Sequence, residues 1–240
     1  MKKYYKIAGL TVQMESFGRT VEQAAPYEIE PVEKADVVIE NAPSEYINKY
    51  SYLSPSECEY IYTGMSFYKQ LINFGGIMLH SSAVVVDGRA YLFTATSGTG
   101  KSTHTALYLK EFGDRAYILN DDKPAVRLED GAFYAYGTPW SGKHDISANE
   151  RVPIAGICVL GRGEKNEISP IGGKAAIYGI YSQTMHPKSE IYMDKVFATL
   201  EKLLELVPIY MLRCNMDPEA ARISYAAMSN PKPKRGNYEA

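Results

Sequence analysis

Short runs of β-branched, aromatic and alternating residues recur along this chain and predict strands. Two such runs, residues 77–86 and 89–94, flank the pair Asp87-Gly88. An Asp-Gly pair suits the twist of a two-residue turn, so these runs are expected to form an antiparallel hairpin. Residues 125–128 and 132–136 predict a second hairpin around an acidic turn that ends in Gly131. Antiparallel connections are therefore expected to dominate.

The remaining strands and the helices follow from the same patterns. Residues 191–207 are the best helix, because Val196, Leu200, Leu203 and Val207 recur at spacings of three and four before Pro208 ends the run. Asp217 is expected to cap a last helix that reaches about residue 228. A further helix is expected over residues 103–112, and the further strands over 4–14, 37–40, 116–119, 152–160, 167–171 and 209–213.

Changes in composition and residue pattern along the chain predict three regions. Residues 1–70 read as a small β-rich region, residues 75–228 as the main domain, and residues 229–240 as a frayed tail. Tyrosines are dense in the first region, and half-buried strand or interface positions explain them better than a ligand-binding surface. These tyrosines are Tyr46, Tyr50, Tyr52, Tyr60 and Tyr62.

Residues 95–103, with the sequence Ala-Thr-Ser-Gly-Thr-Gly-Lys-Ser-Thr, carry the strongest chemical signal. They lie between a strand and the helix expected over residues 103–112, whose apolar face would be Ala106, Leu107 and Leu109. A phosphate-binding loop needs this order, because tight glycine turns aim backbone N–H groups at phosphate oxygens and the helix dipole adds positive potential. Ala95 stands where the usual G-x-x-x-x-G-K-[ST] pattern has glycine.

Each residue of this loop has an expected part in binding a nucleoside triphosphate. Lys101 would reach the β- and γ-phosphates, and the Ser102 hydroxyl would coordinate Mg²⁺. The phosphate-binding set is Ser97, Gly98, Thr99, Gly100, Lys101, Ser102 and Thr103.

Four further residues could act on the bound phosphates. Asp121 and Asp122 follow an apolar strand, where one carboxylate could hold Mg²⁺ and the other could accept a proton, although Asn-Asp-Asp is also a common turn. His80 precedes the loop strand and could face the γ-phosphate or serve as a core residue. Lys143 ends a shaped loop, residues 137–143, that contains Trp140, and could neutralise charge on the transferring phosphoryl group or lie on a surface turn.

Composition limits the kinds of binding partner and the cellular compartment that we expect for this chain. The 240 residues include 26 Lys and Arg against 28 Asp and Glu, a net charge of −2 without a dense basic stripe, which argues against nucleic acid. The cysteines Cys58, Cys158 and Cys214 are widely spaced, which favours buried thiols and a reducing cytoplasm. The longest apolar stretch, residues 76–86, is too short to span a membrane, and the N-terminus does not resemble a secretory signal.

Together these motifs resemble the HPr kinase/phosphorylase family of the phosphoenolpyruvate-carboxykinase-like superfamily. The matching elements are residues 80–83, 97–102, 120–122 and 137–143, within a resemblance over about residues 75–228. The resemblance implies an α/β (α+β) fold in which a nucleotide-binding β-sandwich has flanking helices. It assigns one of Asp121 and Asp122 as general base and the other to Mg²⁺, with Asp121 taken as the base and Asp122 as the metal partner. It also assigns Ser102 to Mg²⁺ and His80 to the reaction centre. The arginine- and asparagine-rich signature of HPr kinases is absent, so the chain is most similar to the small stand-alone kinase-like members.

The expected function is an ATP- and Mg²⁺-dependent kinase. The acceptor would be a hydroxyl, on a serine of a protein or peptide or on a small molecule. A nucleotide-binding regulatory module with little turnover is the alternative, and a minimal carboxykinase is disfavoured by length. Relatives of the family often form homo-oligomers, which makes a homo-oligomer an open expectation here.

Overall fold

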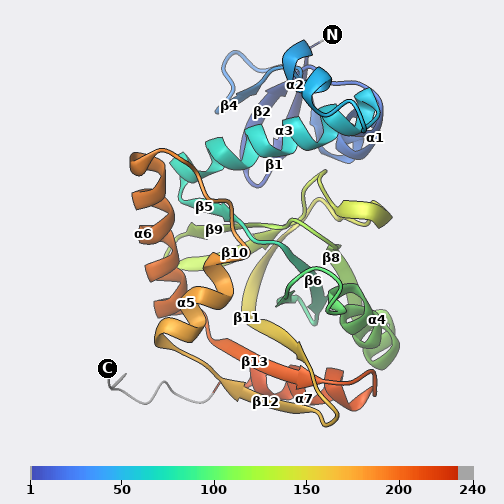
Figure 1. Cartoon of the computed structure of the whole chain (residues 1–240), viewed down its shortest axis with the longest axis vertical. Coiled ribbons are helices and arrows are strands. Elements are labelled where there is room, and N and C mark those ends of the chain that lie inside the picture. The colour runs from blue at the N-terminus through green and yellow to red at the C-terminus, as the bar shows by residue number, and fades with distance from the viewer. Residues whose placement is uncertain (1, 232–240) are drawn as a thin grey trace.

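The computed structural model describes residues 2–231, which form a small N-terminal unit beside a larger α/β unit (Figure 1). A four-stranded sheet in the order β3-β1-β2-β4 organises the N-terminal unit. Its β1–β2 hairpin turns through Ala8 and Gly9, which both have positive φ, and alternate side chains of the two strands are buried. The strands are β1 (Lys3–Ile7), β2 (Leu10–Met14), β3 (Glu28–Ile29) and β4 (Val37–Ile39).

Three helices, which the strand patterns do not predict, belong to this unit. They are α1 (Arg19–Ala24), α2 (Ser44–Lys49) and α3 (Pro55–Leu71). α3 packs against β4, and α1 and α2 contact α3. The interpretation of the tyrosines as strand residues is wrong, because Tyr46 lies on α2, Tyr60 and Tyr62 lie on α3, and Tyr50 and Tyr52 lie in the connection between these helices. Tyr46 packs its ring against those of Tyr50 and Tyr62, at centroid distances of 4.7 and 5.1 Å.

The larger unit is built on a nine-stranded sheet that curls around its longest strand, β11. β11 pairs with β10 near its start and with β13 near its end, while β7 runs along its other edge. Both expected hairpins, β6–β7 and β9–β10, are confirmed. The strands are β5 (Gly76–Met78), β6 (Ser81–Val86), β7 (Arg89–Thr94), β8 (Ala116–Asn120), β9 (Ala125–Glu129), β10 (Ala132–Tyr136), β11 (Arg151–Arg162), β12 (Glu167–Pro170) and β13 (Ile209–Cys214).

Residues 77–86 are expected to form one strand, but the structure divides them between two strands, β5 and β6. β5 pairs with β9 and β6 pairs with β7, so the chain changes partners at Leu79 and His80. This break leaves His80 directly before the central strand β6 rather than inside a strand. Most strand pairs are antiparallel, and only β7–β11 and β11–β13 are parallel within this sheet.

Helices cover both faces of the central strands. Ala83 and Val85 of β6 pack in the apolar core beneath α5 (Gly173–Tyr181) and α6 (Glu190–Leu206). Val84 and Val86 point the other way, into the core beneath α4 (Lys101–Phe112) and α7 (Glu219–Ser229). This alternation buries β6 completely and explains its unbroken apolar sequence. The expected α/β class, with helices flanking a mainly antiparallel sheet, is confirmed.

The helices expected near the C-terminus are confirmed. α6 ends before Pro208, and the Asp217 carboxylate accepts a hydrogen bond from the Glu219 amide at 2.9 Å as α7 begins. α5 has no counterpart in the sequence analysis. The expected tail, residues 229–240, starts at the last residue of α7 and lies outside the described residues from position 232 onward.

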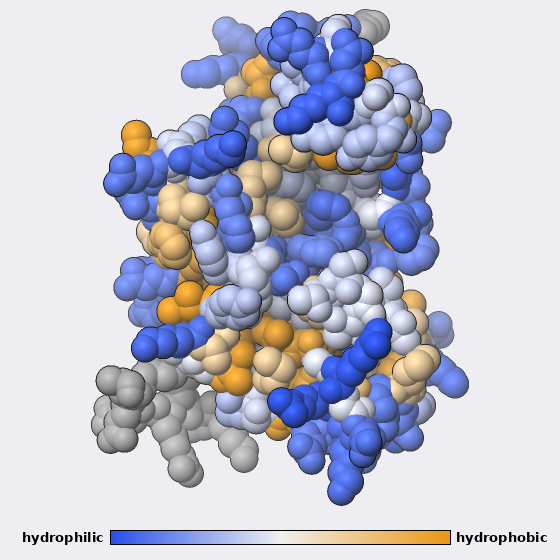
Figure 2. All heavy atoms as spheres, viewed as in Figure 1, coloured by the Kyte–Doolittle hydropathy of each residue, from blue (hydrophilic) through white to orange (hydrophobic). Residues whose placement is uncertain are grey.

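Hydrophilic side chains cover most of the face shown in Figure 2, and apolar side chains gather between α5 and α4. Within residues 2–231, no helix combines the length and the apolar character needed to cross a membrane.

Candidate functional site

The glycine-rich loop joins β7 to α4, the order that phosphate binding requires. Gly98 and Gly100 both have positive φ, which turns the chain tightly before the helix begins at Lys101. The Thr96 and Thr99 hydroxyls lie 2.9 Å apart, and the Thr99 amide donates to the Thr96 carbonyl. Ala95, the departure from the usual motif, is buried at the end of the strand. Ser97, Gly98 and Thr103 are exposed, so the loop is open to a ligand.

The helix that follows buries a different face from the expected one. His104, Thr105 and Tyr108 are buried, whereas Ala106 and Leu109 are exposed. The difference arises because neighbouring hydroxyls pair with the buried hydroxyls of two of these residues: the Tyr108 hydroxyl lies 2.9 Å from Ser224 Oγ and Thr105 Oγ1 lies 2.9 Å from Ser82 Oγ. Polar side chains can occupy a helix core when they have such partners.

Lys101 lies at the first position of α4 and donates to the Ala95 carbonyl at 3.3 Å. Burial lowers the pKa of its amino group, and the nearby carboxylates of Asp122 and Asp121 offset this only in part. The charges of both aspartates therefore reach the lysine of the loop. A bound polyphosphate would supply the negative charge that this partly desolvated amine lacks.

Asp121 and Asp122 follow directly after β8, and Asn120 shapes their turn. The Asn120 side-chain oxygen accepts hydrogen bonds from the amides of Asp122 and Lys123, at 3.0 and 2.7 Å. The side-chain Nδ2 of Asn120 donates to the backbone carbonyl and the hydroxyl of Thr138, at 3.1 and 3.2 Å. The Asn-Asp-Asp sequence is thus a turn and, at the same time, the element that presents two carboxylates toward the loop.

Each aspartate is paired with a histidine. His80 Nε2 lies 3.1 Å from Asp122 Oδ1, and Lys123 contacts the other carboxylate oxygen. Burial alone would raise the pKa of Asp122, but the hydrogen bond from His80 and the charge of Lys123 lower it to about 2. Asp122 is therefore ionised at neutral pH. The structure thus brings His80, Lys101 and both aspartates together, as the sequence analysis expected.

The second pair contains a residue that the sequence analysis missed. His144 Nδ1 donates to Asp121 Oδ2 at 2.9 Å, and Ser82 Oγ donates to the other oxygen, Oδ1, at 2.7 Å. Lys143, the predicted cation, is exposed, and no polar contact joins it to the rest of residues 2–231. Its role stays a prediction, while the adjacent His144 reaches the aspartate.

The turn that carries His144 is held against the end of β8. The Asp121 amide donates to the Ile146 carbonyl at 3.2 Å, and the Ala148 amide donates to the Leu119 carbonyl at 3.0 Å. Gly142 has a φ of +81°, and a Cβ there would lie 2.6 Å from Asp122 Cβ. Only glycine fits, so the Ser141-Gly142 turn lets the chain pass over Asp122 and place His144 beside Asp121.

A cavity of about 390 Å³ lies against the glycine-rich loop. Arg162, at the end of β11, spans its rim and donates to the Gly98 carbonyl at 2.8 Å. Apolar walls come from Leu107, Leu160 and Met216. This mixture of loop backbone, one cation and apolar walls is typical of a site for a small molecule.

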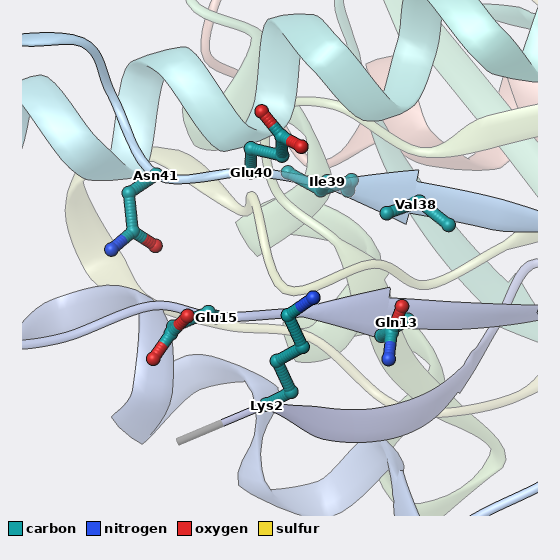
Figure 3. A pocket seen from close by; sticks show the side chains of 7 residues that line it. All are labelled: Lys2, Gln13, Glu15, Val38, Ile39, Glu40 and Asn41. Carbon is teal, nitrogen blue, oxygen red and sulfur yellow. The ribbon is translucent and has the colours of Figure 1, made fainter.

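Another cavity, of about 280 Å³, lies in the N-terminal unit at the ends of β2 and β4 (Figure 3). It is distant in sequence from every candidate residue. Its lining is Lys2, Gln13, Glu15, Val38, Ile39, Glu40 and Asn41.

The described residues contain no cluster of three or more His, Cys, Asp or Glu side chains arranged to hold a metal. Mg²⁺ at nucleotide sites does not need such a cluster, because it takes one or two protein oxygens together with phosphates and water. The ionised Asp122 and the Ser102 hydroxyl at the start of α4 fit this type of donor set.

Two of three comparisons with known proteins find a match for this chain. No curated protein matches it. The HPr(Ser) kinase/phosphatase from Coxiella burnetii is similar in structure at a distance, with 13% sequence identity and a TM-score of 0.38, over 64% of this chain and 99% of that one. A family model described as SynChlorMet cassette protein ScmC matches residues 58–219, which include both aspartates, their histidines and the glycine-rich loop. Since that match spans more than half of the sequence, the chain belongs to the ScmC family.

Proposed function

We propose that this protein is an ATP- and Mg²⁺-dependent kinase that transfers the γ-phosphoryl group to a hydroxyl acceptor. The observation that carries the proposal is the placement of Lys101 at the start of α4, within the field of two carboxylates that each have a histidine partner. A phosphate cradle beside ionised carboxylates is the arrangement that phosphoryl transfer uses. A structural turn would not require a partly buried lysine facing two aspartates.

The roles follow from the positions of the residues. The backbone of residues 97–103 and the helix dipole would hold the phosphates, with Lys101 on the β- and γ-phosphates. Ser102 and Asp122 would hold Mg²⁺, which when bound neutralises phosphate charge and polarises the transferring group. His80 fixes the Asp122 carboxylate through its 3.1 Å contact.

The cavity beside the loop would take the nucleoside. Its apolar walls suit the faces of a base, and Arg162 at the rim could approach the phosphates or ribose. ATP rather than GTP is part of this proposal. The acceptor would be a serine of a protein or peptide, or a small molecule with a hydroxyl group, and the cytoplasm is the proposed compartment.

A regulatory ATP-binding module with little turnover is the second candidate. One observation favours it: Asp121 and Asp122 already have protein partners on both carboxylate oxygens. Such carboxylates could serve to shape the loop. Tight ATP binding without release of ADP, with or without an acceptor, is the result that this candidate predicts.

Calorimetric titration of ATP, with and without Mg²⁺, tests the nucleotide site. We expect Mg²⁺-dependent binding to the wild type and binding about 10- to 100-fold weaker to Lys101→Ala, because charge-assisted hydrogen bonds contribute roughly 1.5–3 kcal/mol. Lys110→Ala is the matched control, since it removes an exposed lysine from the last turn of the same helix. Equal binding by the wild type and Lys101→Ala, or no binding to either, would contradict the proposed site.

A further inference from the structure

The two aspartates of the site differ in how open they are to a substrate. The Asp121 side chain is only 7% exposed, and its two oxygens accept hydrogen bonds from Ser82 and His144. A carboxylate that is enclosed in this way is poorly placed to touch an acceptor hydroxyl directly. Asp121 instead has the surroundings of a group that orients its partners.

His144 has the opposite character, since its side chain is 59% exposed. Its Nδ1–H donates to the Asp121 carboxylate, so the neutral ring carries its lone pair on Nε2. Nε2 has no hydrogen-bond partner among residues 2–231. The pair therefore presents one basic nitrogen atom to solvent.

His80 does not offer the same arrangement. It uses Nε2 to contact Asp122, and its side chain is less exposed than that of His144. Its backbone also fixes it, because the His80 amide donates to the Gln183 carbonyl at 2.7 Å and the His80 carbonyl accepts from Thr94 at 2.9 Å. In the His80 pair the unpaired ring nitrogen among residues 2–231 is Nδ1, on a side chain that is 34% exposed against 59% for His144, so the His144 pair presents the more accessible nitrogen.

Hydrogen bonds connect His144 to the glycine-rich loop. Ser82 uses its only hydroxyl hydrogen on Asp121, so the Thr105 hydroxyl, 2.9 Å away, donates to Ser82. Thr105 lies on α4, one turn after Lys101. A series of hydrogen bonds therefore runs from Thr105 through Ser82 and Asp121 to His144. It links the imidazole to the helix that would bind phosphate.

We infer that His144 is the general base of the proposed transfer and that Asp121 is its positioning residue; this inference rests on the proposed kinase function. The acceptor O–H bond breaks and the proton moves to Nε2, while the acceptor oxygen forms a bond to the γ-phosphorus. The bond from that phosphorus to the bridging oxygen breaks, and ADP leaves with the electron pair. Asp121 stabilises the imidazolium, which then releases its proton to water.

Charged groups around this turn set the conditions for any pH dependence. Arg19 of α1 pairs with Asp145, the residue after His144, and Asp122 lies against Gly142. These groups are Asp121 and Asp122 after β8, Lys143 and Asp145 on the turn itself, Arg19 from the N-terminal unit, and the Tyr60 hydroxyl of α3, which accepts from the Gly142 amide at 3.3 Å.

The test compares release of phosphate from Mg²⁺-ATP, with water as the acceptor, in the wild type and His144→Asn. Asparagine can donate to Asp121 as Nδ1 does, but it cannot accept a proton at neutral pH. We expect the rate to fall about 10²- to 10⁴-fold with unchanged ATP affinity, and the acidic limb of the pH–rate profile to disappear. His186→Asn, which changes an exposed histidine that contacts the Tyr181 carbonyl, should leave rate and profile unchanged.

A second measurement does not depend on turnover. The ¹⁵N chemical shifts of the His144 ring should show the tautomer with the proton on Nδ1, and Asp121→Asn should change that tautomer. A wild-type rate in His144→Asn, an unchanged pH limb, or a proton on Nε2 in the wild type would overturn the inference. Absence of Mg²⁺-ATP binding or of phosphate release in the wild type would instead contradict the proposed kinase, so the two failures are distinguishable.

Discussion

At the scale of single residues, His104 of α4 is expected to make the stability of the fold depend on pH. Its Nε2 lies 3.3 Å from Ser224 Oγ, while its Nδ1 has no partner within residues 2–231. Ser224 donates its hydrogen to the Ala220 carbonyl, so Nε2 must be the donor and Nδ1 carries the unpaired lone pair. Burial lowers the pKa of His104 to about 4.

This lowered pKa predicts acid sensitivity. The unfolded chain, with a histidine pKa near 6.5, binds a proton before the folded chain does, so stability is complete above that pH and is lost as the pH falls toward 4. From about pH 7.5 to about pH 5, His104 should lower the free energy of unfolding by roughly 2 kcal/mol. Urea denaturation measures this loss, which should be smaller in His104→Leu.

The matched control is His186→Leu, which changes an exposed histidine and should keep the full acid dependence. Identical pH dependence in the wild type and His104→Leu would show that another group causes the acid sensitivity.

At the scale of elements, the sequence predicted best what local chemistry decides. The loop at residues 95–103 combines glycine turns, a preceding strand and a following helix within a few residues, so its structure follows from its neighbours. His144 could not be found in this way. Its contact with Asp121 depends on residues 142–148 pairing with the end of β8, which brings together residues more than 20 positions apart in the sequence.

The helix α3 was missed for a different reason. Its sequence carries a capping box, in which Ser54 Oγ accepts from the Glu57 amide at 3.2 Å and the Glu57 carboxylate accepts from the Ser54 amide at 2.9 Å. Proline at the next position strengthens this signal. The dense tyrosines suggested strands instead. That prediction failed because the preference of aromatic side chains for strands is only a weak average.

The capping box gives a stability prediction. Ser54→Ala should lower the free energy of unfolding by about 1 kcal/mol, or about 2–4 °C in melting temperature for a chain of this size. Ser189→Ala is the control, since Ser189 holds the corresponding position before α6 but makes no side-chain capping bond. Calorimetric melting that shows equal losses in the two variants would contradict a specific contribution from the capping box.

At the scale of the whole molecule, the N-terminal unit holds the turn that carries His144. Arg19 Nε donates to Asp145 Oδ1 at 3.0 Å, its guanidinium also contacts the Gly142 carbonyl, and it lies 4.1 Å from the centre of the Tyr60 ring. The Tyr27 hydroxyl lies 2.7 Å from Ser147 Oγ. These contacts join residues that precede the segment matched by the family model to residues within that segment, which begins inside α3.

Arg19→Met tests whether this contact serves the site. The variant keeps an unbranched side chain that can cover Tyr60 but loses every hydrogen bond to the turn, so His144 should lose its fixed position beside Asp121. Because misplacement of a catalytic group slows transfer more than it weakens binding, phosphate release should fall about tenfold or more while Mg²⁺-ATP affinity stays unchanged. Lys3→Met, which removes an exposed ion pair with Glu28 in the same unit, should change neither quantity. Equal rates in the wild type and Arg19→Met would mean that the N-terminal unit contacts the turn without supporting the reaction, whereas a parallel loss of ATP affinity would place its effect on the glycine-rich loop instead.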